Sequence, residues 1–170
     1  LGDQGVGLLL SDSTNSEVDG STLSEQTVAV AFERLFALAK GRVVITLFAS
    51  HLHRVQHAMA LAARTGRKVA LAGRALERNV QIARTLGFLD VPDDLIVPWE
   101  ALPHLPKSQI LIMSTGAQAE QRSALNNMLR PDASHLRIEP GDTVILASRT
   151  IPGNEPNVTG MIDRLLARGA

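Results

Sequence analysis

The sequence predicts an α/β fold in which a mostly parallel sheet is covered by helices on both faces. Three observations lead to this prediction. Several short runs are apolar at every position and begin with β-branched residues, as in strands buried on both sides, and residues 43–49 are the clearest case. Between these runs, apolar residues recur every three or four positions, which is the spacing of amphipathic helices. The chain has 170 residues, of which 45% are hydrophobic, as expected for one globular domain.

The predicted elements alternate along the chain, and glycine or proline marks most of their boundaries. The first three helices end at Gly41, Gly66 and Gly87, because glycine is a favoured residue just past a helix. Prolines between residues 92 and 106 predict a connection rich in loops. The predicted strands are residues 7–10, 43–49, 68–72, 94–97, 109–114 and 142–148, and the predicted helices are residues 23–40, 51–64, 76–86, 118–130 and 154–168.

Composition excludes several kinds of site. The chain has no cysteine, which excludes disulfides, thiolate metal sites and cysteine nucleophiles. The 17 basic and 17 acidic residues give a formal net charge of zero, so the overall charge does not indicate a nucleic-acid partner. A local basic patch could still bind one. One Trp, four Phe and no Tyr argue against a platform of several stacked rings. The longest apolar run is far shorter than the roughly 18 residues of a membrane span, and no dinucleotide fingerprint or phosphate loop is present.

Two carboxylates are candidate functional groups, and each has a plainer interpretation. Asp12 directly follows the first predicted strand and is flanked by hydroxyls. Its carboxylate is suited to ligating one cation or bridging two, but also to stabilising the turn that follows. Glu25 lies three residues after Thr22, so the pair forms a capping box that predicts the start of a helix. Orienting another ligand is a compatible role for Glu25.

The segment Ser50–Arg54 lies between a predicted strand and a predicted helix. Ser50 is a natural N-cap, and its hydroxyl, the next backbone amides and the positive end of the helix would together hold a phosphate. Capping without any ligand is the alternative. His51, His53 and His57 have spacings that allow contact with a metal, but no carboxylate is in register to complete a site. Solvated or hydrogen-bonded histidines are therefore favoured.

Several stretches of the chain carry recognisable motifs: residues 11–15 (SDSTN), 22–25 (TLSE), 48–54 (FASHLHR), 66–70 (GRKVA), 73–74 (GR), 114–120 (STGAQAE), 138–145 (IEPGDTVI) and 151–155 (IPGNE). In this order they resemble ribonuclease J of the metallo-β-lactamase superfamily, over nearly the whole chain. Ala117 and Ala119 stand where that family usually has Ser and Gly, and His51 stands where it often has Asn.

The resemblance implies a Rossmann-like β-CASP domain at residues 21–170, preceded by the end of a metallo-β-lactamase-like domain at residues 1–20. It also implies a bacterial RNA-processing nuclease that degrades RNA from a 5′-monophosphate end, cuts internally, and uses a two-metal centre, usually of zinc. The family's metal-bridging Asp corresponds to Asp12 and its acidic β-CASP motif to Glu25, so both are predicted catalytic residues. The predicted phosphate site is Ser50, His51, Leu52, His53 and Arg54.

The family's His-x-His-x-Asp-His metal motif and its later histidine motifs are not among these residues. One carboxylate cannot hold two metals, so we expect a piece of an enzyme, or a degenerate relative, that is inactive by itself. The expected partners are RNA and further copies of the full-length protein, in the cytoplasm and away from membranes. The alternatives are a non-catalytic RNA-binding or subunit-contact module and an unrelated α/β domain for a small ligand. Residues expected to line an RNA path are Arg54, Arg67, Lys68 and Arg74.

Overall fold

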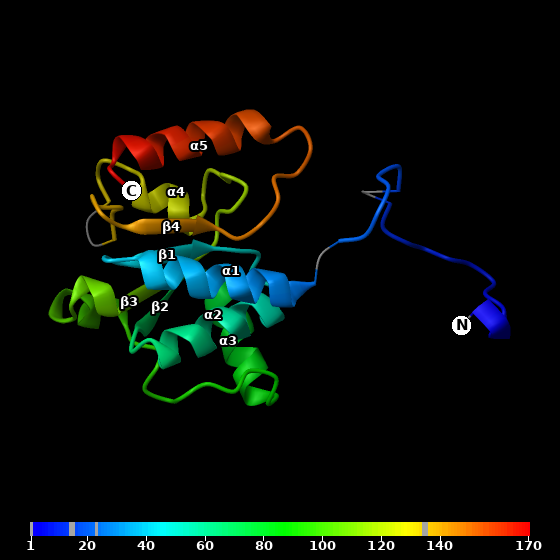
Figure 1. Cartoon of the computed structure of the whole chain (residues 1–170), viewed down its shortest axis with the longest axis horizontal. Helices are drawn as coiled ribbons and strands as arrows, with labels where there is room; N and C mark the ends of the chain where they lie inside the picture. Colours follow the sequence, from blue (N-terminus) through cyan, green and yellow to red (C-terminus); the bar gives the residue numbers. More distant parts are fainter. Residues whose placement is uncertain (1, 14–15, 23, 134–135) are drawn as a thin grey trace.

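Four parallel strands form a single sheet in the middle of the structure (Figure 1). The structure is a computed structural model that describes residues 2–13, 16–22, 24–133 and 136–170. The strand order is β2-β3-β1-β4, and every neighbouring pair runs in the same direction. The prediction of a parallel sheet is therefore confirmed. The strands are β1 (Val43–Thr46), β2 (Lys68–Ala72), β3 (Ile110–Ser114) and β4 (Thr143–Leu146).

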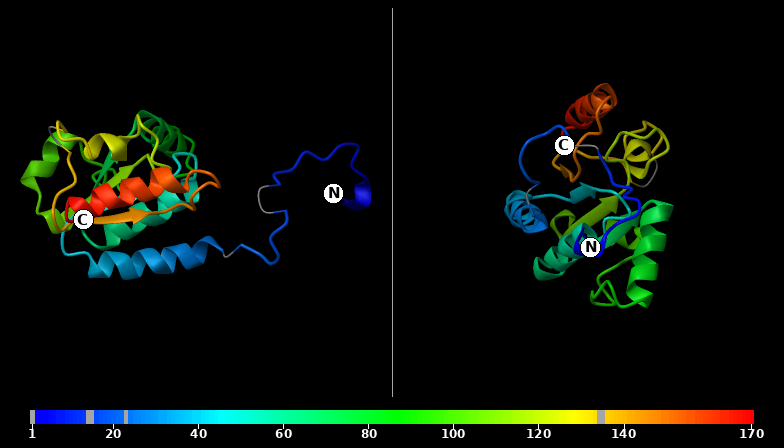
Figure 2. Two further views of the ribbon diagram at one scale, coloured as in Figure 1. Left: turned by 90° about the horizontal axis from the view of Figure 1, so that it is seen from above. Right: turned by 90° about the vertical axis from the view of Figure 1, so that its right-hand side faces the viewer.

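Helices cover both faces of this sheet, as predicted. Buried side chains of α1, α2 and α3 form one apolar cluster with one face, and those of α4 and α5 form a second cluster with the other. Two further views show the sheet enclosed between these layers (Figure 2). The helices are α1 (Glu25–Leu38), α2 (Leu52–Arg64), α3 (Arg74–Thr85), α4 (Ala124–Met128) and α5 (Glu155–Ala167), with short 3₁₀ segments η1 (Gly2–Gln4), η2 (Trp99–His104) and η3 (Lys107–Gln109).

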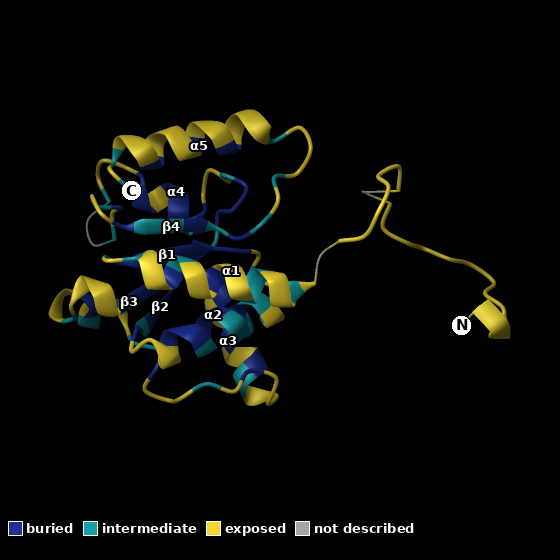
Figure 3. Ribbon diagram, viewed as in Figure 1, coloured by how far each residue is buried: buried dark blue, intermediate teal, exposed yellow. Residues whose placement is uncertain are grey.

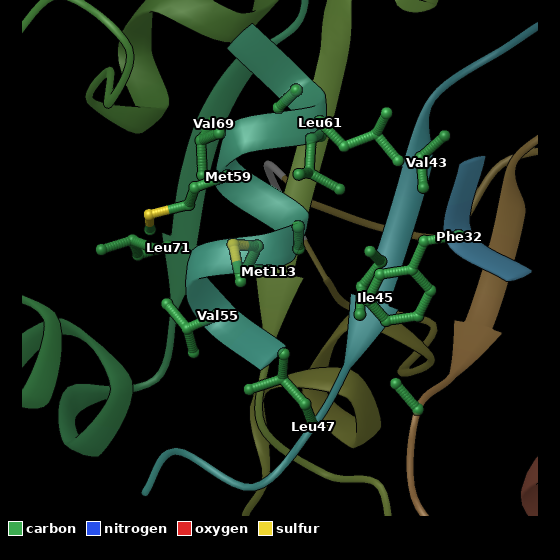
Figure 4. Packing of buried hydrophobic residues seen from close by; sticks show 14 of the residues in the cluster. Phe32, Val43, Ile45, Leu47, Val55, Met59, Leu61, Val69, Leu71 and Met113 are labelled. Atoms are coloured by element: carbon green, nitrogen blue, oxygen red, sulfur yellow. The ribbon is translucent and has the colours of Figure 1, made fainter. Parts of the chain in front are cut away.

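Burial on both faces explains why the strands are apolar at consecutive positions. Val43 and Ile45 of β1 belong to the cluster beneath α1 and α2, whereas Val44 between them belongs to the opposite cluster. All three are fully buried. Figure 4 shows Val55 and Met59 of α2 packed among the strand side chains of the first cluster. Each such side chain contributes about 1.5–3 kcal/mol by leaving water, so a polar residue at any of these positions would weaken the sheet.

The strands end level with one another, and this gathers the loops that follow them. Thr46 pairs with both Ser114 and Leu146, and Ser114 also pairs with Ala72. These residues are the last of their strands. The four following loops therefore leave from one edge of the sheet, where open parallel sheets bind their ligands. We call it the carboxyl edge.

The N-terminal residues extend away from the domain on the side of the carboxyl edge (Figures 1 and 2). Residues 7–10, predicted as a strand, are extended and exposed but belong to no strand (Figure 3). A strand requires a hydrogen-bonded neighbour, and within the described residues none pairs with this segment. Thr14, Asn15 and Leu23, which belong to the quoted motifs, lie outside the described residues. The predicted domain boundary at residue 20 stays a prediction.

Two predicted elements are shorter than expected. The helix predicted at 118–130 is limited to α4, and Ala119 within the predicted range has a positive φ angle of 59° that no right-handed helix allows. The strand predicted at 94–97 is reduced to one bridge between Ile96 and Val69. In both places, the local pattern is overridden by the surrounding loops.

Candidate functional site

The predicted site residues Glu25, His51 and Arg54 form one cluster at the carboxyl edge. Nε of Arg54 donates to Oε2 of Glu25 at 3.0 Å, and a second guanidinium nitrogen donates to Oε1 of the same carboxylate. The third nitrogen donates to the carbonyl of Ala147, which follows β4. Nε2 of His51 lies 3.5 Å from Oε1 of Glu25. The cluster therefore joins the start of α1, the start of α2 and the end of β4.

The charges within this cluster keep Glu25 ionised. The hydrogen bond from Arg54 is the main cause that lowers the pKa of Glu25 below its ordinary value, and the charges of Arg54 and His51 act in the same direction. Partial burial raises the pKa and is the second influence after the hydrogen bond, but the pKa stays lowered on balance. An ionised carboxylate that already accepts two hydrogen bonds from one guanidinium group acts at neutral pH as a hydrogen-bond acceptor in a fixed position, not as a proton donor. Arg54, with all its guanidinium nitrogens engaged, is held in one orientation.

Two expected helix caps differ from the structure. Ser24 is the N-cap of α1 but makes no side-chain capping bond, and Glu25 turns to Arg54, so the predicted capping box with Thr22 is wrong. At α2 the N-cap is His51, whose Nδ1 accepts from the backbone N–H of Arg54 at 3.3 Å, so capping by the preceding serine is also wrong. In both cases, tertiary contacts outweigh a local capping preference.

The loop before α2 uses several of the amides that a phosphate would need. The N–H of His51 donates to the carbonyl of Phe48 at 2.9 Å, and the N–H of Leu52 donates to the carbonyl of Ser50 at 3.0 Å. The side chain of Ser50 is exposed, as is that of His53. The loop therefore presents side chains more than free backbone amides to solvent, and phosphate binding there stays a prediction.

A second polar network joins the loop after β3 to the loop after β4. Gln118 is only 6% exposed. Its amide nitrogen donates to the carbonyl of Arg149 at 2.8 Å, and its amide oxygen accepts from the N–H of Ile151 at 2.9 Å. The side chain of Asn154 donates to the backbone carbonyl of Gln118 at 2.6 Å. The structure thus brings together two motifs, at 114–120 and 151–155, that lie far apart in the sequence.

Sequence reasoning missed the polar residues of α4 and α5 that hold the loop after β3 in place. Asn126 of α4 is buried and donates to the carbonyls of Ala119 at 3.0 Å and Glu120 at 2.9 Å. Its own oxygen accepts from Arg164 of α5 at 2.7 Å. The available signal was weak, an asparagine beside Leu125 in a short helix whose other buried residues are apolar.

Asp12 is not brought into the cluster. It belongs to the exposed segment of residues 2–13, which extends away from the sheet (Figure 3). Over the described ranges, the structure has no group of three His, Cys, Asp or Glu side chains that could hold a metal ion. Among the same residues, no helix is both long and apolar enough to cross a membrane. The role predicted for Asp12 stays a prediction.

Comparison with known proteins decides the family. The model of the family described as ribonuclease J, beta-CASP domain, matches residues 40–165. The chain belongs to this family. It is 42% identical over 169 residues to a ribonuclease J of Helicobacter pylori, covering 99% of this chain and 24% of that protein. It is 44% identical over 169 residues to ribonuclease J of Thermus thermophilus, covering 99% of this chain and 29% of that protein.

The similarity to ribonuclease J extends beyond these two relatives. Ribonuclease J of Mycobacterium tuberculosis is 42% identical over 170 residues, which is 100% of this chain and 30% of that protein. The chain therefore spans between about a quarter and a third of the length of the curated relatives that it matches. The parallel sheet with helices on both faces agrees with the β-CASP domain expected from the sequence motifs.

Proposed function

We propose that this chain is the β-CASP part of a metal-dependent ribonuclease that degrades RNA from a 5′-monophosphate end and also cuts internally. The observation that carries the proposal is identity of 42–44% to proteins named ribonuclease J over 99% or more of the chain. The cluster of Glu25, His51 and Arg54 at the carboxyl edge supports it, because that is the edge where parallel sheets bind ligands.

Within this function, the Glu25–Arg54 pair acts by positioning. It fixes the start of α2 against the start of α1 and the end of β4, so that Ser50 and His51 are held in a rigid loop. The phosphate contacts come from the Ser50 hydroxyl and from His53 on the exposed side of α2, while His51 holds the loop through its contacts with Glu25 and the Arg54 N–H. Arg54, whose charge is paired with Glu25, holds the loop in place behind them, and Leu52 packs the loop against the domain.

The residues described here do not fit a complete metal centre, so we derive no chemical step through one. We propose that Asp12 contributes one carboxylate to a zinc pair whose other ligands lie outside the described residues. A carboxylate is a suitable bridging ligand for two such cations. The N-terminal segment leaves the domain at the carboxyl edge, which is the edge that carries the Glu25 cluster.

The metal proposal is tested in the full-length protein with Asp12→Asn, which keeps size and removes charge. Asp3→Asn is the matched control because Asp3 is an exposed aspartate of the same segment. We expect Asp12→Asn to lower bound zinc, measured by elemental analysis, and to lower RNA cleavage by roughly 10–100-fold or more. Wild-type zinc content and cleavage in this variant would remove Asp12 from the metal site.

The phosphate proposal is tested separately with Ser50→Ala. The expected result is a weaker preference for 5′-monophosphorylated over 5′-hydroxyl RNA, because one hydroxyl contact to the phosphate is lost. Ser108→Ala is the control, since Ser108 is exposed in η3, just before β3 and so near the opposite edge of the sheet. An unchanged preference would reject the phosphate site.

A non-catalytic RNA-binding or subunit-contact module is the competing function. It predicts RNA binding by the full-length protein without hydrolysis in the presence of zinc, manganese or magnesium. Hydrolysis that depends on Asp12 decides for the enzyme. Action in the cytoplasm and self-association of the full-length protein are further proposals from the family resemblance; size-exclusion chromatography with light scattering tests the second.

A further inference from the structure

A polar pocket of about 760 Å³ opens at the carboxyl edge, beside the ends of β2 and β3. It is separate from the Glu25 cluster, which lies at the ends of β1 and β4. Its walls come from the first turn of α3, the residue after β3, and the segment that leads into α4. The lining residues are Gly73, Arg74, Ala75, Glu77, Arg78, Thr115, Arg122, Ala124 and Asn127.

Three arginines give this pocket a local positive charge in a chain whose net charge is zero. Arg74, Arg78 and Arg122 line it together with a single acid, Glu77. Within the described part of the chain, no hydrogen bond or ion pair engages any of these three guanidinium groups. Arg54, by contrast, is bonded on all its nitrogens. Because unpaired guanidinium groups form bidentate bonds to phosphate, the pocket is suited to a phosphate group.

A second, more apolar pocket of about 370 Å³ adjoins the first and shares several of its walls. It is lined by Trp99, the only tryptophan of the chain, and by Met128 and Leu136. Asn127 lines both pockets and offers an amide that can donate and accept at their junction. The apolar pocket with its tryptophan ring is suited to a base, and the arginine pocket beside it is suited to a phosphate, so together they match the two ends of a nucleotide.

The position of the pair of pockets agrees with a path for a single strand. Strands β1 and β2 are separated only by β3, so their ends lie roughly 10 Å apart along the carboxyl edge. A single-stranded RNA held at the Ser50 loop after β1 would therefore reach the arginine pocket after β2 within a few nucleotides.

We propose that these adjoining pockets form an RNA subsite that holds one nucleotide, with the base against Trp99 and the phosphate against Arg74, Arg78 and Arg122. The subsite rests on the proposed ribonuclease function and adds to it a second point of attachment, away from the 5′ phosphate. The subsite has no base specificity, because stacking on one ring and contact with a phosphate are possible for any base.

The test measures binding of fluorescently labelled single-stranded RNA to the full-length protein, with a chelator present to prevent cleavage. The double variant Arg78→Gln/Arg122→Gln removes two charges from the pocket. The matched control is Arg34→Gln/Arg64→Gln, which removes two exposed charges from α1 and the carboxyl end of α2. A third variant, Trp99→Leu, removes the ring.

Each variant has its own expected signature. The pocket double variant lowers affinity and reduces the slope of log affinity against log salt by up to about 0.7, since the pocket neutralises one phosphate of a single strand. Trp99→Leu weakens binding by roughly 5–100-fold and leaves the salt slope unchanged. The control variant retains the wild-type slope. Thermal unfolding checks that all variants remain folded.

The outcomes separate this subsite from the function on which it rests. If the wild-type protein binds RNA and the pocket variants bind it as well as the control does, the subsite is overturned and the ribonuclease proposal is left intact. Failure of the wild-type protein to bind RNA overturns the ribonuclease proposal. Adenosine monophosphate serves as the free-nucleotide probe. If the pocket variants lose its binding but keep the wild-type affinity for RNA, the pocket takes a free nucleotide and the RNA subsite is refuted.

Discussion

Replacing Gln118 should separate the two loops that it joins. Its side chain makes bonds of 2.8 Å to the Arg149 carbonyl, 2.9 Å from the Ile151 N–H and 3.2 Å to the Ser148 hydroxyl. Each bond contributes about 0.5–1.5 kcal/mol, so Gln118→Ala should lower the free energy of unfolding by roughly 2–4 kcal/mol. Gln118→Met keeps the volume but loses the same bonds, and should lower it by nearly as much.

Urea unfolding followed by circular dichroism measures both variants. The matched control is Gln56→Ala, because Gln56 also makes two amide bonds of 3.1 Å, to the backbone of Asp90, but at an exposed site. We expect the control to lose less than about 1 kcal/mol, since water replaces the lost partners. A loss below about 0.5 kcal/mol in Gln118→Met would show that volume, not hydrogen bonding, makes this position important.

Three further changes test other features. Ala119→Gly should raise the free energy of unfolding by about 0.5–1 kcal/mol, because alanine has a positive φ of 59° there. Arg42→Met should lower it by about 3–5 kcal/mol by leaving the buried carboxylate of Asp142 unpaired, whereas Arg42→Met combined with Asp142→Leu should cost less. Glu25 has a pKa lowered by Arg54, so its stabilising contribution is complete above pH about 4.5 and is lost as pH falls through the lowered pKa. Glu25→Gln should remove that acid dependence.

Chemical unfolding measures these changes, and each has an outcome that contradicts it. A destabilised Ala119→Gly would show that the loop does not hold alanine under strain. A double variant at Arg42 and Asp142 as unstable as the single variant would show that the arginine stabilises the chain by more than pairing with the acid. A profile of unfolding free energy between about pH 3 and 6 that is the same in Glu25→Gln and wild type would refute the Glu25 argument.

The strands show how much of the secondary structure the local sequence can predict. The run that begins at Val43 is apolar on both faces, and only a buried central strand requires that, so β1 and its parallel partners could be predicted. The segment that begins at Gln118 also shows helical spacing, yet most of it is a loop. Its side chain and backbone bond to partners more than thirty residues away, and a local pattern contains no record of them.

The candidate site divides in the same way. Glu25, His51 and Arg54 could be selected from motifs, but their mutual contacts could not, because 29 residues separate Glu25 from Arg54. The motifs suggested a helix N-terminus with free amides after Ser50. In the structure, the His51 side chain caps α2 and several of these amides bond to carbonyls of the same loop. Arg74 was expected to line an RNA path, but the pocket around it was not predicted, because its walls come from three separated segments, one of which contributes Arg122.

The sequence by itself determined the parallel α/β architecture, since hydrophobic period and glycine stops are local properties that burial enforces at every strand and helix. It also carried the motifs that place the chain in the ribonuclease J family. Only the tertiary structure decided which charges are neutralised and which stay available. Arg54 is paired with Glu25, whereas Arg78 has no acidic partner among the described residues, and that difference depends on distances between elements that the fold brings together.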